Sequence, residues 1–181
     1  MSFEPEINLS EMLYSPKDIA KIICMRDMSS RQSADLVKKI WKYERAFLSV
    51  DDYDNEKSFV QEVNRFVSGN YDKKDKAADV EYANQMGFDI KKEDFITDFR
   101  GVNIYFKDIR LQYLFYGKRN IVWRTLRPLL ELYGLQRRSV QFNRFLRECL
   151  IYYHLKCTKI DGTACHLETV GLDEQLSFVV V

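Results

Sequence analysis

The residues best suited to chemistry in this chain are cysteines and histidines gathered near its C-terminus. They are Cys149, His154, Cys157, Cys165 and His166. His154 and Cys157 are three positions apart and would share one face of a helix. A closed tetrahedral zinc site needs four ligands and usually carries a Cys-x2-4-Cys pair, which is absent here. We therefore expect reduced thiols and no metal, with metal binding by this cluster kept as the alternative.

Sequence signatures of common enzymes are missing. The glycines are scattered singly, so no phosphate-binding loop is formed, and neither a Gly-x-Ser-x-Gly elbow nor a His-Glu-x-x-His pair occurs. Nothing near Cys157 and His154 indicates an activated dyad. The acids Asp51, Asp52 and Asp54 lack the glycine and terminal glutamate of a calcium loop. We predict a non-enzymatic protein without a cofactor, and a nuclease built on dispersed acids stays the alternative.

The charges of the chain are segregated along the sequence although the net charge is only +1. Residues 107–160 hold twelve Lys and Arg against three Asp and Glu, whereas residues 46–106 and 161–181 are acidic. A segment this basic attracts polyanions such as nucleic acids. The alternative is that the basic residues pair with the acidic middle, residues 46–106, within the fold.

Composition indicates a folded protein. The 181 residues include 12 Phe and 11 Tyr but only 7 Gly and 3 Pro, which excludes a disordered or collagen-like chain. No apolar run is long enough to cross a membrane, and the first residues lack the pattern of a secretory signal. We expect a cytoplasmic protein without membrane contact. In such a protein four cysteines are more often thiols than disulfides.

Two successive helices are predicted near the N-terminus. Ser15-Pro16 starts the first, residues 25–28 form a turn, and Ser29 or Ser30 caps the second. The inward face of the second helix is expected to carry Ala34, Leu36, Val37, Ile40 and Trp41.

Residues 15–41 resemble the helix-turn-helix segment of excisionase-like and phage or plasmid regulators, although Cys24 or Met25 stands where that pattern commonly has glycine. The resemblance implies DNA contacts from the second helix by Ser29, Ser30, Arg31, Gln32 and Lys38. Arg and Gln suit the edges of guanine and adenine, while Lys and Ser reach phosphates. A plain helical hairpin within an all-helical core is the alternative.

In the second half, alternation predicts a strand at residues 102–106, and residues 121–133 are predicted as a helix kinked at Pro128. Ser139 is expected to cap an amphipathic helix. Its apolar face would carry Phe142, Phe145, Leu146, Cys149, Leu150 and Tyr153. Residues 164–170 and 175–180 are predicted as the strands of a hairpin.

Residues 121–180 resemble a winged helix in the order helix, turn, amphipathic helix and β-hairpin. The resemblance implies nucleic-acid contacts by Arg137, Arg138, Gln141, Arg144 and Arg147. The wing carries Glu168, Asp173 and Glu174, which would repel a phosphate backbone, so we expect it to stay out of the minor groove. Winged helices also serve as protein–protein modules, which is the alternative.

The expected fold is mainly α with a small C-terminal β-hairpin. It comprises an N-terminal helical domain at residues 1–70, an acidic helical connector at 71–100 and a winged-helix-like basic domain at 101–181. The expected function is that of a regulator or accessory factor of mobile-element type that binds double-stranded DNA, as a single chain or a homodimer. The alternative is an inhibitor or adaptor that binds an acidic protein. Its basic and aromatic surface would include Tyr113, Phe115, Tyr116, Tyr152 and Tyr153.

Overall fold

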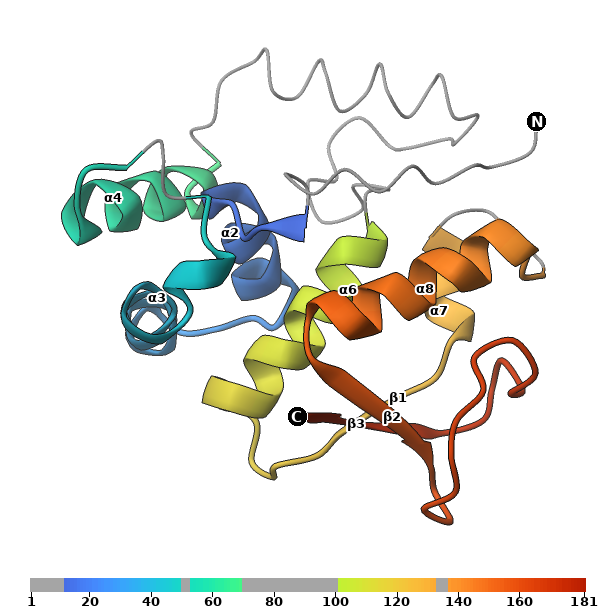
Figure 1. The fold of residues 1–181 in the computed structure, drawn as a ribbon. Coiled ribbons are helices and arrows are strands. Elements are labelled where there is room, and N and C mark those ends of the chain that lie inside the picture. The colour runs from blue at the N-terminus through green and yellow to red at the C-terminus, as the bar shows by residue number, and fades with distance from the viewer. Residues whose placement is uncertain (1–11, 50–52, 70–100, 133–136) are drawn as a thin grey trace. The chain divides into compact units, whose positions relative to one another are not determined.

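The computed structural model describes residues 12–49, 53–69, 101–132 and 137–181 (Figure 1). The chain divides into two compact units, one of Leu13–Asp98 and one of Met1–Met12 with Phe99–Val181. We call them the N-terminal unit and the C-terminal unit and describe each by itself. The acidic connector expected at residues 71–100, together with Asp51 and Asp52, lies outside the described residues.

The N-terminal unit begins with the two helices expected from the sequence. Helix α2 spans Pro16–Met25, and Ser15 and Asp18 cap it reciprocally. Helix α3 spans Ser30–Tyr43, and its cap is Ser29. Between them Asp27 has a φ of 47°, so the left-handed position of the turn is Asp27 and neither Cys24 nor Met25. Aspartate tolerates this conformation better than most residues.

A third helix completes the core of this unit. The 3-10 turn η1 (Arg45–Phe47) leads away from α3, and helix α4 (Glu56–Val67), capped by Asn55, packs against α2 and α3. The buried core of this unit is formed by Tyr14, Ile19, Ala20, Ile22, Ile23, Leu36, Val37, Ile40, Leu48, Phe59, Val63 and Phe66. The prediction that Ala34 and Trp41 face inward is not met, because Ala34 is exposed and Trp41 is only half-buried.

The C-terminal unit begins with a helix where a strand was expected. Helix α6 spans Gly101–Leu111 and continues into a π-helical turn, η3 (Gln112–Tyr116). The prediction of a strand at residues 102–106 is therefore wrong. Every residue from Phe106 to Leu111 is buried, charged residues included. A helix buried on all sides loses its polar face and with it the 3.6-residue period that reveals helices in a sequence.

The helix expected at residues 121–133 is also wrong in its first part. Val122–Arg124 form strand β1, and helix α7 begins only at Arg127 and ends at Leu132. Pro128 is the second residue of α7, where no intrahelical bond is required of its nitrogen. The proline thus belongs to the start of a helix, and no kink arises from it.

Helix α8 (Val140–Tyr152) agrees with the expectation. Ser139 caps it, with Oγ accepting from Phe142 N at 3.1 Å. The predicted apolar face is buried at Phe142, Phe145, Leu146, Cys149 and Tyr153, and Leu150 is half-buried. The helix ends at Tyr152, and the chain turns through His154 at a φ of 51° into strand β2.

The sheet has three strands. Strands β2 (Leu155–Lys159) and β3 (Leu176–Val180) are antiparallel, and β1 pairs antiparallel with the other edge of β3, giving the order β1-β3-β2. Within this unit α6 and α8 lie on the same side of the sheet (Figure 1). The unit is thus helical with a small antiparallel sheet, in which β3 alone agrees with a strand predicted for the hairpin.

The strand predicted at residues 164–170 is wrong. Within it Ala164 alone forms a bridge, to Thr158, and Val170 N donates to His166 O in a turn. The apolar residues Leu167 and Val170 are buried as parts of that turn. Their spacing is also typical of a strand, which explains the wrong prediction. The strand that pairs with β3 in place of residues 164–170 is β2, Leu155–Lys159.

Candidate nucleic-acid interface

The solvent face of α3 carries the N-terminal residues expected to contact DNA. Ser30, Arg31 and Lys38 are exposed. Arg31 and Lys38 are two helical turns apart, about 10 Å along the axis, and lie on the same face. Neither has an ion-pair partner in the part of the chain that the structure describes. The two cations are therefore available to an external anion.

Gln32 is engaged in the cap of the same helix. Its Oε1 accepts from Ser29 N at 2.9 Å and from Ser29 Oγ at 2.9 Å, and Ser29 Oγ accepts from Gln32 N. A bidentate contact with adenine needs the Gln carbonyl as an acceptor. Gln32 would have to give up the capping interaction to make that contact, so its first role is to fix the start of α3.

Neighbouring charges on α3 are partly balanced. Lys39 pairs with Asp35 at 2.7 Å, and the Lys42 ammonium lies 4.8 Å from the centroid of the Tyr43 ring. The interaction with Tyr43 raises the pKa of Lys42. Since Asp35 offsets only Lys39, this face keeps a positive charge along its length.

The outward face of α8 carries two of the expected arginines, and both are ion-paired. Arg144 Nε lies 2.9 Å from Glu148 Oε1 one turn on, and Arg147 pairs with Glu168. Both guanidinium groups are largely exposed. Two apolar side chains share this face, Val140 at 82% and Ile151 at 71% exposure. The side chain of Gln141 lies outside what the structure describes.

Arg138 faces the protein, whereas its neighbour Arg137 is exposed. The Arg138 guanidinium donates to the carbonyl of Leu167 and, at 2.5 Å, to that of Val170. Partial burial lowers the pKa of Arg138. These bonds tie the turn at residues 166–170 to the start of α8, which gives Arg138 a role in holding the fold together.

Acids of the last twenty-one residues neutralise several bases of the basic segment. Besides Arg147 with Glu168, Asp173 accepts from Arg127, and Glu174 lies 3.3 Å from Lys159. All three acids expected in the wing are thus paired within the unit. Among the described residues of the basic segment, the bases that have neither an ion pair nor a side-chain hydrogen bond are Lys118, Arg119, Arg137 and Lys156.

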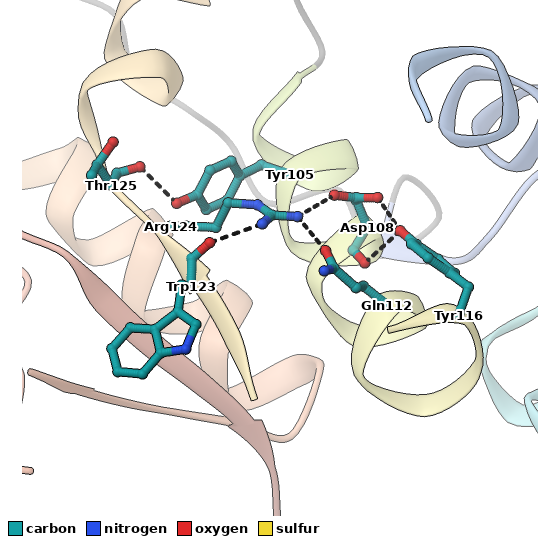
Figure 2. Close-up of polar contacts among 7 residues, drawn as sticks. All are labelled: Tyr105, Asp108, Gln112, Tyr116, Trp123, Arg124 and Thr125. Atoms are coloured by element: carbon teal, nitrogen blue, oxygen red, sulfur yellow. Dashed lines mark hydrogen bonds and ion pairs between the residues drawn. The ribbon is translucent and has the colours of Figure 1, made fainter. Parts of the chain in front are cut away.

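A buried polar network that the sequence analysis did not single out joins α6 and η3 to β1 (Figure 2). At its centre the Asp108 carboxylate, almost fully buried, lies 3.0 Å from Arg124 Nη2. Tyr116 OH donates to the same carboxylate, and Arg124 also donates to Gln112 Oε1 and to Trp123 O. Every polar group at the centre has a protein partner, which gives the network a structural role.

Two further contacts extend this buried layer. Tyr105 OH donates to Thr125 O at 2.9 Å, and burial raises the pKa of Tyr105. Arg110 Nη1 donates at 2.7 Å to the carbonyl of Tyr153, at the C-terminal end of α8. A cation at that position also meets the negative end of the helix dipole. No signal in the sequence indicated this network, because charged residues such as Lys107, Asp108 and Arg110 are ordinarily exposed.

The cysteine and histidine cluster is divided by the fold. Cys149 is buried on α8, and burial raises the pKa of its thiol. His154 lies beyond the end of α8 and Cys157 lies on β2, so the expected common helix face is wrong. Within the described residues no three or more side chains of His, Cys, Asp or Glu come together to hold a metal ion. Cys157 and Cys165 are brought into contact.

No protein-family model, curated protein or solved structure matches this chain. None of the described helices is both long and apolar enough to cross a membrane. What the chain does must therefore be argued from its own residues.

Proposed function

We propose that this protein binds double-stranded DNA through the solvent face of α3, as a non-catalytic regulator or accessory factor. The observation that carries the proposal is the pair of exposed, unpaired cations Arg31 and Lys38 on a capped helix that follows the turn at residues 26–29. This is the arrangement in which a helix-turn-helix presents its second helix to the major groove.

Each residue of this face has a role in the proposal. Arg31, in the first turn of α3, is placed where a recognition helix meets base edges, and its guanidinium suits guanine. Lys38, two turns further along, contacts a phosphate. The hydroxyl of Ser30 is a second phosphate donor, while Ser29 and Gln32 hold the helix start.

The C-terminal unit contributes less to DNA binding in this proposal than its charge would indicate. The order α7, α8, β2 and β3 supports the winged-helix resemblance, with β1 as an added strand. Arg144 and Arg147 would have to exchange Glu148 and Glu168 for phosphates, which offsets much of the gain. Arg137 is exposed without an ion-pair partner, so it is the expected phosphate contact of this unit.

Variants of α3 test the proposal. Replacing Arg31 and Lys38 together by alanine removes two cations from the interface, so the dependence of log affinity on log salt should flatten by roughly 0.9 for each phosphate that is no longer neutralised. Fluorescence anisotropy on a random-sequence duplex measures this slope. Lys57→Ala is the matched control, because Lys57 is an exposed lysine on α4 of the same unit. An equal effect of both variants would sink the assignment to α3.

A second candidate is supported by the exposed apolar side chains of α8. Val140 and Ile151 flank Arg144 and Arg147, a mixture typical of protein interfaces. Two of the aromatic residues expected in a protein-binding surface are less suitable for it, since Tyr153 is fully buried and Tyr116 OH donates to Asp108. Arg144→Ala with Arg147→Ala tests the part that α8 takes in DNA binding. A flattened salt slope assigns α8 to DNA, whereas an unchanged slope is what DNA binding by α3 predicts and leaves the exposed face of α8 to a protein partner.

A further inference from the structure

Cys157 and Cys165 face each other across two antiparallel segments. Thr158 forms an antiparallel bridge with Ala164, and Lys159 N donates to Thr163 O at 3.0 Å. Continuing this register by one residue places Cys157 opposite Cys165. Directly opposed residues in antiparallel strands have Cα atoms about 4.5–5.5 Å apart. That range lies within the roughly 4.4–6.8 Å found across disulfides.

The two side chains also lie close together. Because opposed residues point to the same face of a sheet, both thiols are on one side, near enough for each to influence the ionisation of the other. Cys157 is buried and Cys165 is half-buried. An external reagent can therefore reach Cys165 first, and the resulting sulfur adduct would lie against Cys157.

The surroundings of Cys165 favour its thiolate. The interaction with Cys157 lowers the pKa of Cys165. Burial and Glu174 oppose this effect, while the positive charges of Lys159 and Arg138 add to it, and the pKa is lowered overall. The pKa of Cys157 is raised, first by its interaction with Cys165 and then by burial. This difference in pKa gives the two thiols different roles. Cys165 attacks an external disulfide, and Cys157 then resolves the mixed disulfide that forms on Cys165.

We propose that Cys157 and Cys165 are a redox-active dithiol that closes reversibly to a disulfide by exchange with a low-molecular-weight disulfide, RSSR. The Cys165 thiolate attacks one sulfur of RSSR, forming a mixed disulfide and releasing one RS⁻, which takes up the proton that Cys165 gave up. The Cys157 sulfur then attacks Cys165 Sγ, releases its own proton and displaces the second RSH. The protein loses two protons and two electrons, and RSSR is reduced to two RSH.

The test uses the full chain, incubated with oxidised and reduced glutathione at graded ratios, quenched with acid and alkylated. Trypsin cleaves after Lys156 and Lys159, so the disulfide would join the peptide of residues 157–159 to that of residues 160–181. We expect this linked peptide to rise with the oxidised fraction and to disappear on reduction. Accumulation of glutathione on wild-type Cys165 without the linked peptide, or a disulfide to Cys24, would overturn the proposal.

Variants assign the two roles. Cys157→Ser should stop the reaction at a mixed disulfide on Cys165, whereas Cys165→Ser should prevent modification of Cys157. Cys24→Ser is the control, because Cys24 lies in the N-terminal unit and should leave the linked peptide unchanged. Circular dichroism shows whether Cys157→Ser stays folded. If it does not, the time course of the wild-type protein decides, since the mixed disulfide on Cys165 must precede the linked peptide.

Discussion

Arg137 and Arg138 are neighbours in the sequence, yet only Arg138 is tied into the fold. Its guanidinium donates hydrogen bonds to two carbonyls of the turn at residues 166–170, while Arg137 is exposed. Both were expected to contact nucleic acid. At the scale of single residues, the structure therefore separates bases that hold the protein together from bases that are available to a partner.

Arg138→Ala should lower the free energy of unfolding by about 1–3 kcal/mol, because it leaves two carbonyls in a partly buried turn without their donor. Urea denaturation measures this change. Arg137→Ala is the neighbouring control and should leave the midpoint unchanged. Equal midpoints for the two variants would show that the Arg138 contacts contribute nothing to stability.

Residue-scale features could be predicted when they depend on neighbours in the sequence. Ser15 and Ser139 were expected to cap helices and do so, because a cap bonds to a nitrogen only three residues away. The partners of Arg138 and of Arg127 could not be predicted. The carbonyl of Val170 is 32 residues beyond Arg138, and Asp173 is 46 residues beyond Arg127. Only the tertiary fold brings each arginine to its partner.

Among the elements, amphipathic helices were predictable and buried ones were not. Helices α2, α3 and α8 each present one apolar face, and all three occur where that pattern indicated them. From Phe106 to Leu111 helix α6 is buried on all sides, so no polar face revealed its period in the sequence. Strand β1 is short, and its neighbouring apolar residues merged with α7 in the sequence pattern.

The Asp108–Arg124 pair fastens α6 to β1, so we expect Asp108→Asn to destabilise the C-terminal unit strongly. Removing one partner of a buried pair leaves the other charge uncompensated, which costs about 3–5 kcal/mol in comparable cases. Chemical denaturation followed by circular dichroism measures the change. Asp173→Asn is the matched control, because it breaks an exposed pair with Arg127 and should leave stability unaltered. If Asp108→Asn changed the free energy of unfolding only slightly, apolar packing and not the ion pair would keep β1 in place.

For the molecule as a whole, the segregation of charge along the sequence overstated the basic surface. Acids near the C-terminus pair with Arg127, Arg147 and Lys159, and Arg110 is buried. This neutralisation comes from acids of residues 161–181, whereas the alternative considered from the sequence was pairing with the acidic middle. The unpaired cations of α3 carry the proposed interface, although their segment has a smaller formal excess of bases than residues 107–160.

The measurement that tests DNA binding most directly is fluorescence anisotropy of the full chain on random-sequence duplex DNA, titrated across salt concentration. Phosphate contacts release counterions, so the account predicts that log affinity falls linearly with log salt, with a slope of roughly −0.9 for each contact. Because Lys and Arg neutralise phosphates, contacts by Lys38 and Arg137 would give a modest but clear slope. Absence of binding at low salt would contradict the account and leave the face of α8 with Val140 and Ile151 as the surface to study.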